Sequence, residues 1–338
     1  TITNIPLPGT DRQFQFRVLH LLIILLITTL SYGSYATYKK WRRSQQKYDV
    51  PVDANLLPRA TETSAYIGKL AERQNRVFLN LNDLKMHTIV AGSTGSGKSF
   101  ASQVIAEEAL ENDVAVVIFD PTAQWTGFLR ELEQDNIKEL FKAFGMNPKK
   151  DTTSYKGNII RVDNPLEIID LDEYMKPGEI TIFDCHKMSF EDLDKFVANT
   201  VSQVFMSELD EQEDLRLLMC YDEVHRLLPK FGGSGAGFMQ IERACREFRK
   251  WGIGVLLISQ VLSDFMNEIK ANINTEVLMR TRDEEDLEHV SMKYGDNVVQ
   301  SLVKASVGTG MLQNSDYNKG RPYLTRFRPV KHAIERDR

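Results

Sequence analysis

The sequence predicts an α/β protein with a central, mostly parallel sheet flanked by helices and preceded by one transmembrane helix. Short apolar, β-branched runs alternate with amphipathic stretches, which is the pattern of strands and helices that follow each other along a parallel sheet. A glycine-rich loop stands between one such run and a helix, and an uncharged hydrophobic stretch lies near the N-terminus. With 42% hydrophobic and 26% charged residues among 338, the composition is that of a globular protein and excludes wholesale disorder.

The hydrophobic stretch covers residues 18–38, which carry no charge unless His20 is protonated. At about 1.5 Å per residue, such a helix is about 31 Å long and matches a hydrocarbon core of about 30 Å. A basic segment comes directly after it: Lys39, Lys40, Arg42, Arg43 and Lys47. It acts as a stop-transfer signal, which argues against a cleaved signal peptide, and its charge favours a cytoplasmic location for the rest of the chain. We therefore expect a single-pass protein of the cell membrane with a cytoplasmic main domain.

The chain is accordingly divided into five parts. Residues 1–17 form a short extracytoplasmic N-terminus, 18–38 the transmembrane helix, 39–65 a basic juxtamembrane segment and linker, 66–330 the main domain, and 331–338 a basic C-terminal tail. The predicted strands are 88–91, 115–120, 158–162, 180–184, 215–221, 253–259 and 276–280. The predicted helices are 99–112, 127–145, 191–209 and 237–250, and the glycine-rich residues 232–237 are expected to form a flexible loop.

Charge and cysteine content restrict the function only weakly. The net charge of −5 gives no sign of a protein that coats nucleic acid, although the C-terminal region is locally basic and is suited to phosphate, to anionic lipid or simply to solvent. Its basic residues are Lys319, Arg321, Arg326, Arg328, Lys331, Arg336 and Arg338. Three cysteines, Cys185, Cys220 and Cys245, lack the spacing of metal ligands, so they are interpreted as small core residues in a reducing compartment.

The glycine-rich loop has the pattern GxxxxGK[ST], between an apolar strand and a helix. Glycines let backbone N–H groups surround a phosphate, and the helix N-terminus adds positive potential. Lys98 is expected to reach the β- and γ-phosphates of ATP, and the Ser99 hydroxyl to bind Mg²⁺. The predicted nucleotide-binding residues are Gly92, Ser93, Thr94, Gly95, Ser96, Gly97, Lys98, Ser99 and Phe100. The alternative is a glycine-rich structural turn.

A pair of carboxylates, Asp222 and Glu223, comes after the apolar strand 215–221. In a parallel sheet this end of a strand faces the ligand crevice, so we expect Asp222 to belong to the Mg²⁺ shell and Glu223 to polarise the attacking water as a general base. An ordinary acidic loop is the alternative. The residues also resemble a helicase DExH box, but the other motifs of that family are missing, and His225 is therefore interpreted as a helix-start residue.

Polar residues near the next strand complete the candidate site. Gln260 ends strand 253–259 and is placed to sense the γ-phosphate, although it could merely satisfy local backbone groups. The preceding helix carries a basic face made of Arg243, Arg246, Arg249 and Lys250. This face is either solvated or supplies an arginine finger to a neighbouring subunit, where negative charge develops in the transition state.

These motifs, taken in order, resemble the HerA/FtsK superfamily of hexameric ATPases. STGSGKS, YDEVHRLLP, the glycine-rich loop, REFRKWGIGVLLISQ, ANINTEVLMRTRDEEDLEHV and RPYLTRFRP lie between residues 67 and 329. The resemblance is closest to HerA-type and type IV secretion ATPases, including archaeal DNA-import ATPases of the Ced kind. It implies a RecA-like fold, a ring of six subunits, ATP with Mg²⁺, DNA in the pore, and a trans arginine finger at Arg249 or, second, Arg246. One departure is Gln124, which stands where such proteins often have an acid a few residues beyond an Asp-Pro pair, here Asp120-Pro121.

Three functions are compatible with these motifs. The first is an ATP-driven DNA translocase in DNA import or conjugation-like transfer, with DNA, the membrane and a membrane channel protein as partners and Lys230 as a candidate pore contact. The second is a membrane ATPase that powers protein secretion or pilus assembly. The third is a nucleotide-binding scaffold without turnover, against which the intact Lys98, Ser99, Asp222 and Glu223 argue.

Overall fold

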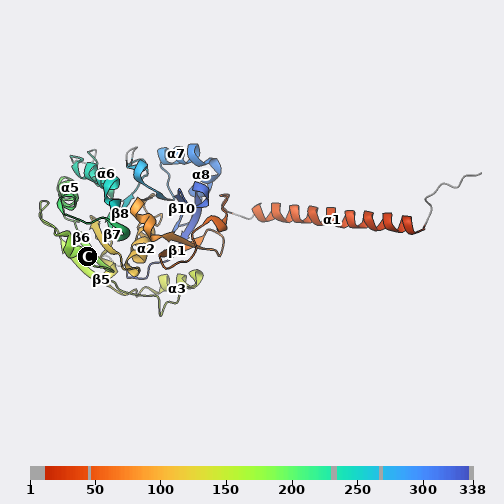
Figure 1. Ribbon diagram of the computed structural model, residues 1–338, viewed down its shortest axis with the longest axis horizontal. Coiled ribbons are helices and arrows are strands. Elements are labelled where there is room, and N and C mark those ends of the chain that lie inside the picture. Colours follow the sequence, from red (N-terminus) through yellow and green to blue (C-terminus); the bar gives the residue numbers. More distant parts are fainter. Residues whose placement is uncertain (1–11, 45–46, 230–233, 266–268, 335–338) are drawn as a thin grey trace, which may run out of the picture. The chain divides into compact units, whose positions relative to one another are not determined.

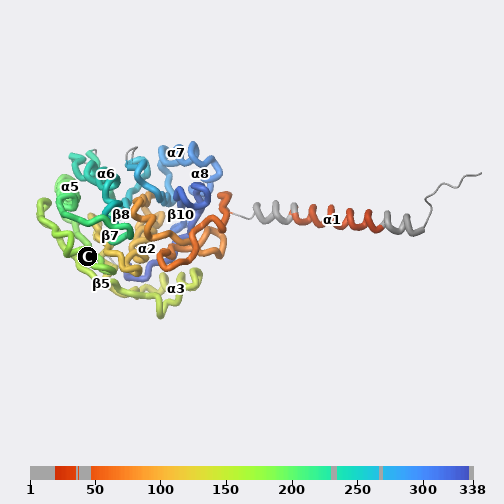
Figure 2. Tube along the Cα trace, viewed as in Figure 1, coloured from red at the N-terminus to blue at the C-terminus, as the bar shows by residue number. Residues whose placement is uncertain are grey.

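The computed structural model describes residues 12–44, 47–229, 234–265 and 269–334, and within the first range the side chains of residues 20–35 and 37 only (Figure 2). Two compact units make up the chain, Thr1–Asp49 and Val50–Arg338. Lys230 and most of the predicted loop 232–237 lie outside the described residues, as do Arg336 and Arg338.

The first unit contains one helix, α1 (Arg12–Ser44). Its leucine and isoleucine side chains between residues 21 and 30 are exposed, and the Thr28 and Thr29 hydroxyls donate to the carbonyl of Leu25 at 2.9 Å. Within the described part of the chain, no helix is both long and apolar enough to cross a membrane. The predicted span over residues 18–38 is therefore not confirmed, and the side chains of residues 18, 19, 36 and 38 lie outside the described ones.

The second unit is built on a sheet of eleven strands in the order β2-β1-β11-β10-β9-β3-β8-β7-β4-β6-β5 (Figure 1). The strands from β9 to β5 in this order pair in parallel, whereas β2, β1, β11 and β10 extend the sheet in antiparallel fashion. The strands are β1 (Ser64–Leu70), β2 (Arg76–Asn80), β3 (Thr88–Ala91), β4 (Ala115–Asp120), β5 (Lys156–Arg161), β6 (Glu179–Asp184), β7 (Gln212–Tyr221), β8 (Trp251–Ser259), β9 (Thr275–Met279), β10 (Thr309–Asn314) and β11 (Tyr323–Phe327).

Helices cover both faces of the parallel part of this sheet. Val116 and Ile118 of β4 belong to the same core as α2, whereas Phe119, which points the opposite way, packs against Phe196 of α5 with ring centroids 5.7 Å apart. Figure 1 shows α5 and α6 beside each other. The helices are α2 (Lys98–Glu111), α3 (Asp135–Phe144), α4 (Leu171–Tyr174), α5 (Phe190–Met206), α6 (Ala236–Glu247), α7 (Glu284–Tyr294) and α8 (Asp296–Val303).

The predicted central, mostly parallel sheet flanked by helices is confirmed, and the seven predicted strands correspond to β3 through β9. The four antiparallel strands were missed because their residues are only partly apolar; β1, for example, alternates between buried and half-buried positions. The three cysteines are free and buried, as their interpretation required.

The single helix predicted over residues 127–145 is wrong. A 3-10 turn, Thr126–Leu129, buries Phe128, and the chain is extended at Arg130. Glu131 then pairs with His332 in an isolated β-bridge, and α3 begins only at Asp135. A contact with a residue about two hundred positions away thus interrupts the helical pattern.

Candidate nucleotide-binding site

Parallel strands bring the candidate residues to one edge of the sheet. Ala91, which ends β3, lies opposite Ser259, which ends β8. Tyr221, which ends β7, lies opposite Phe119 near the end of β4. The loops after these four strands therefore meet, as expected for the carboxyl ends of parallel strands.

The phosphate-binding loop leads from β3 into α2. Gly97 precedes α2 with a φ of 99°, a conformation that favours glycine, and a Cβ there would lie 2.7 Å from the Gly308 nitrogen. The Gly308 N–H donates to the carbonyl of Ser96 at 3.0 Å. Gly308, just before β10, thus packs against the loop. This contact was not predicted from the sequence, because no motif around Val307-Gly308 indicates it.

Most of the predicted nucleotide-binding residues line one cavity of about 360 Å³. The cavity is lined by Ser93, Thr94, Gly95, Gly97, Lys98, Ser99, Phe100, Gln124, Glu223 and Val307. Gly92 and Ser96 lie beneath it: a Cβ on Gly92 would come within 2.6 Å of Met279, and Ser96 is buried. These two residues shape the loop rather than line the cavity.

Lys98, Glu223 and Gln260 form one connected group. Lys98 Nζ lies 2.9 Å from Glu223 Oε1, and Gln260 Nε2 donates to Glu223 Oε2 at 3.3 Å. Burial raises the pKa of Glu223, but the Lys98 ammonium, together with His225 and the Gln260 amide, outweighs burial, so the pKa is lowered and the carboxylate is ionised. His225 Nδ1 lies 3.1 Å from Glu223 Oε2. Glu223 has a φ of 50°, a strained conformation of the kind found where a side chain must be held at a site.

Asp222 is held deeper than Glu223. Trp125 Nε1 donates to its Oδ2 at 3.1 Å, and the Glu223 N–H donates to its Oδ1 at 2.9 Å. Burial is the main cause that raises the pKa of Asp222, and the neighbouring Asp120 carboxylate raises it further. Lys98 lowers it in part, and the resulting pKa is about 7. The hydrogen bond from Trp125 and the electrostatic effect of Asp120 on this carboxylate were not predicted from the sequence.

The donor set fits Mg²⁺ bound together with a nucleotide. Ser99 Oγ lies 3.2 Å from Gln124 Oε1, which places the amide of Gln124 beside the predicted metal ligand. Among the described residues, no group of three or more His, Cys, Asp or Glu could hold a metal ion by itself. Mg²⁺ at ATPase sites uses one or two protein groups together with phosphate oxygens and water, so Ser99 and Asp222 suffice.

Arg246 and Arg249 are not brought to this cavity. Arg246 pairs with Glu242 at 2.5 Å, and exposed Arg249 lies just before β8 begins, with Nη1 4.0 Å from Met86 Sδ. Gln260 comes after the other end of β8, about 26 Å away at 3.3 Å per residue. Arg249 is therefore too far from the phosphate loop of its own chain to serve it, and Arg246 does not line the cavity either.

The fold and the site together define a nucleotide-binding protein of the P-loop type. Residues 65–200 match the family described as "Helicase HerA, central domain". The "DNA double-strand break repair helicase HerA" of Sulfurisphaera tokodaii is 21% identical over 325 residues, which cover 72% of this chain and 64% of that protein. VirB4 of Thermoanaerobacter pseudethanolicus has a similar structure, with a TM-score of 0.52, 13% identity, and coverage of 80% of this chain and 98% of that one. The match over residues 65–200 agrees with the resemblance of the motifs to the HerA/FtsK superfamily, and the likeness to VirB4 supports the RecA-like fold.

Proposed function

We propose that the chain hydrolyses ATP and uses the energy to move DNA, as a membrane-anchored ring that serves DNA import or conjugation-like transfer. The observation that carries the proposal is the convergence of Lys98, Asp222, Glu223 and Gln260 on one edge of the sheet. The relative from Sulfurisphaera is named as a DNA repair helicase, which favours DNA as the substrate.

In this proposal, each of these residues has a role during hydrolysis. Lys98 and the loop N–H groups bind the β- and γ-phosphates, and Ser99 and Asp222 would hold Mg²⁺, which neutralises charge on the phosphate oxygens. Glu223 accepts a proton from the attacking water. Because Lys98 is paired with Glu223, a γ-phosphate competes for the same ammonium, and binding of ATP would release the carboxylate to act on water. Gln260, which donates to the same carboxylate, would sense the γ-phosphate.

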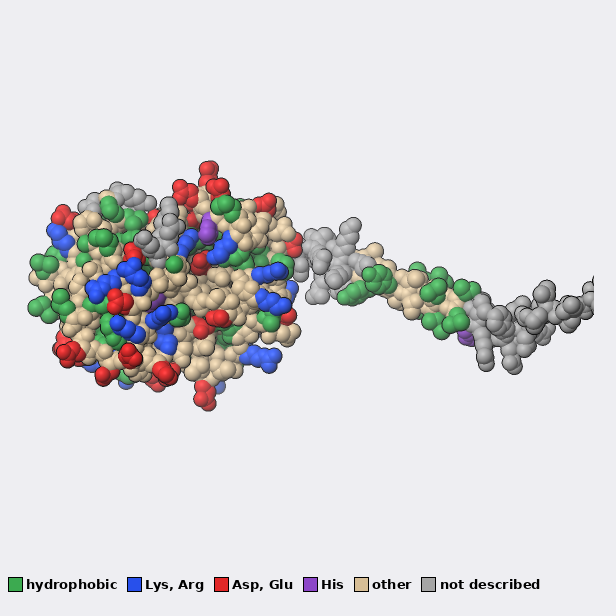
Figure 3. All heavy atoms as spheres, turned by 45° about the horizontal axis from the view of Figure 1, so that its top comes forward, with side chains coloured by type: hydrophobic (Ala, Val, Ile, Leu, Met, Phe, Trp, Pro, Cys, Tyr) green, Lys and Arg blue, Asp and Glu red, His purple; other side chains and the backbone are tan. Residues whose placement is uncertain are grey.

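DNA is expected to raise the rate of ATP hydrolysis several-fold, and this stimulation is expected to weaken steeply with salt, because DNA binding releases counterions. The measurement is ATP turnover by the full chain with and without duplex and single-stranded DNA. On the face shown in Figure 3, basic and acidic side chains are interspersed, so this face offers DNA a few basic residues rather than a uniformly basic surface. Turnover indifferent to DNA but raised by membranes or a protein partner would instead support protein secretion or pilus assembly. Binding of ATP without turnover would identify a scaffold.

A ring, here a homohexamer, would bring Arg249 to a neighbouring nucleotide. The support is that Arg249 is exposed and lies at the edge of its own sheet opposite the phosphate loop. Subunits with Arg249→Ala, mixed with subunits carrying Lys98→Ala, are expected to regain part of the lost ATPase activity. In such mixtures an intact phosphate site of one subunit can meet an intact arginine of another. An absence of rescue at every mixing ratio would count against a trans finger; Arg246→Ala tests the second candidate in the same way.

Attachment to the cell membrane through residues 18–38, with the ATPase domain in the cytoplasm, is part of the proposal. The apolar side chains of α1 between residues 21 and 30 are exposed, and the hydroxyls of Thr28, Thr29 and Thr37 donate to carbonyls of their own helix. Such internal bonding is what polar groups need in a bilayer. The attachment is tested by flotation of the full chain with lipid vesicles, and the chain is expected to stay with the vesicles at high salt. Recovery of the chain in the unbound fraction would refute the attachment.

A further inference from the structure

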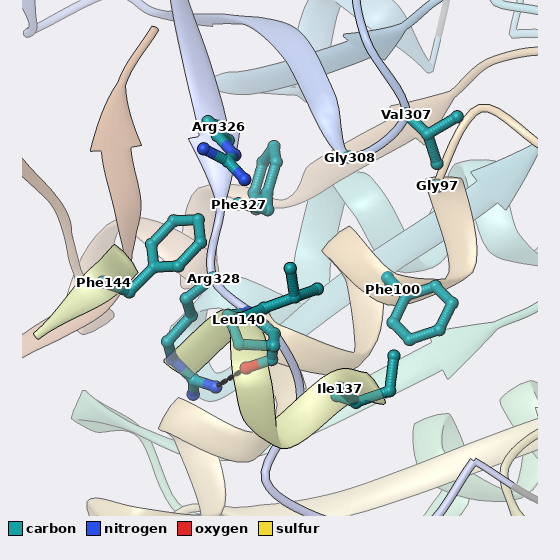
Figure 4. A pocket seen from close by; sticks show the side chains of 11 residues that line it. Gly97, Phe100, Ile137, Leu140, Phe144, Val307, Gly308, Arg326, Phe327 and Arg328 are labelled. Atoms are coloured by element: carbon teal, nitrogen blue, oxygen red, sulfur yellow. Dashed lines mark hydrogen bonds between the residues drawn. The ribbon is translucent and has the colours of Figure 1, made fainter. Parts of the chain in front are cut away.

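A second cavity lies beside the phosphate-binding site. It has a volume of about 190 Å³, and α3, the start of α2 and the chain around β11 enclose it (Figure 4). The lining residues are Gly97, Phe100, Ile137, Leu140, Phe144, Val307, Gly308, Arg326, Phe327, Arg328 and Pro329. Gly97, Phe100 and Val307 also line the phosphate cavity, so the two spaces adjoin at the first turn of α2.

The walls of this second cavity are largely apolar. In Figure 4, Phe100 of α2 faces the α3 wall, which carries Ile137 and Leu140. Its size is close to that of the apolar cavities of about 150 Å³ that are known to take up a benzene ring. The cavity is therefore suited to a flat ring system rather than to a charged or strongly hydrated group.

Few polar groups reach the cavity. The Arg328 guanidinium is engaged by Glu107 at 2.6 Å, Glu108 at 2.7 Å and the carbonyl of Pro329 at 3.0 Å, so its donors are in use. The Arg326 guanidinium lies over the ring of Phe144, 5.2 Å from its centre. An arginine can only donate hydrogen bonds, and both adenine and guanine present acceptor nitrogens at their edges.

We propose that this cavity binds the purine base of the nucleotide whose phosphates the loop Gly92–Ser99 holds, with α3 as one wall. The inference rests on the proposed nucleotide-hydrolysing function and adds where the base sits and how it is recognised. Three consecutive residues then contact different parts of the nucleotide. Lys98 and Ser99 face the phosphates, whereas Phe100 lines both cavities. Because the walls supply apolar contact and a donor but no side-chain acceptor to select the adenine amino group, the site discriminates weakly between ATP and GTP.

The test compares ATP with inorganic tripolyphosphate, which has the phosphates but no base. Titration calorimetry of the full chain with Mg²⁺ measures the affinity for each. Leu140→Trp fills the cavity from α3, and Glu139→Trp places the same side chain on an exposed neighbouring position that does not line it. Leu140→Trp is expected to weaken ATP binding at least tenfold and to leave tripolyphosphate binding unchanged, whereas Glu139→Trp changes neither. GTP is expected to bind the native chain within about tenfold of ATP.

The outcomes separate the two hypotheses. Equal ATP affinity in Leu140→Trp and Glu139→Trp overturns the base site but leaves the phosphate site intact. A native chain that binds neither tripolyphosphate nor ATP overturns the proposed function and the base site with it. Ile137→Asn keeps the space but makes the wall polar, and it should also weaken ATP binding alone; unchanged tripolyphosphate binding shows in each variant that the fold persists.

Discussion

Replacing Glu223 by Gln is expected to lower the rate of ATP hydrolysis by about 10²- to 10⁴-fold, the range that a general base contributes, while ATP still binds. Glutamine has the same shape as glutamate, and its amide oxygen can still accept from Lys98, which in the native chain donates to Oε1 at 2.9 Å. The variant loses the negative charge that takes a proton from water. Rapid-quench measurement of a single turnover, together with an independent measurement of nucleotide affinity, separates hydrolysis from binding.

Two comparisons make this result specific. Glu213→Gln alters an exposed glutamate in the same strand, β7, at the end remote from the site, and it should leave both rate and affinity unchanged. Lys98→Ala removes a phosphate ligand and should weaken binding itself. If Glu223→Gln lost binding and hydrolysis in equal measure, Glu223 would be a binding residue and not the general base.

The residues of the site that sequence reasoning found are those whose signal is local. Lys98 and Ser99 stand in a motif whose spacing is set by one loop, and Asp222 and Glu223 come after a run of apolar residues that identifies a strand. The partners found only in the structure, Trp125 for Asp222 and Gly308 for Ser96, come from segments about a hundred or two hundred positions away. No periodicity or motif connects such segments, because their contact depends on the order of strands in the sheet.

The basic C-terminal region shows that the sequence also does not predict which charged side chains are buried and paired. Arg328 and Lys331 counted toward a basic C-terminal region, but Arg328 is 1% exposed and Lys331 Nζ lies 2.5 Å from Glu111 Oε2 of α2. Their partners, Glu107, Glu108 and Glu111, stand on the helix that begins at the phosphate loop. A count of charges along the sequence cannot distinguish a solvated arginine from one that is paired with carboxylates 220 positions away.

Arg328→Met is accordingly expected to reduce the free energy of unfolding by about 3–5 kcal/mol, the cost of leaving a buried ion pair without one partner. Arg328 Nη1 lies 2.6 Å from Glu107 Oε2 and Nη2 lies 2.7 Å from Glu108 Oε1, with both arginine and Glu107 fully buried. Methionine fills much of the same space but removes the buried cation that both carboxylates share, and leaves only His332 beside Glu107 and Lys331 beside Glu108. Urea denaturation followed by tryptophan fluorescence measures the difference, and Arg321→Met, at an exposed arginine of the same region, should change stability by less than about 0.5 kcal/mol.

The pH dependence of the destabilisation caused by Arg328→Met is a stricter test of the ion pair between Arg328 and Glu107. Burial would raise the pKa of Glu107, but Arg328 and His332 outweigh it and hold the pKa at about 2. A lowered carboxylate pKa contributes stability that is present above the unfolded value near 4.5 and is lost as the pH falls through about 2. In Arg328→Met the main source of the lowering is gone, so protonation of Glu107 relieves the buried charge. The destabilisation caused by Arg328→Met should therefore shrink between pH 7 and pH 4.

A double variant shows whether the cost arises from the pair or from lost packing. Glu107→Gln removes the charge that Arg328→Met leaves unpaired, so the combined variant should be destabilised by less than the sum of the two single changes. Additive effects, with no change between pH 7 and pH 4, would mean that Arg328 stabilises through its apolar stem alone. Coupling would instead establish that the helix that starts at the phosphate loop is fixed by charges from the far end of the chain. The position of the loop Gly92–Ser99 would then depend on residues 328–332, although no motif in the sequence connects the two segments.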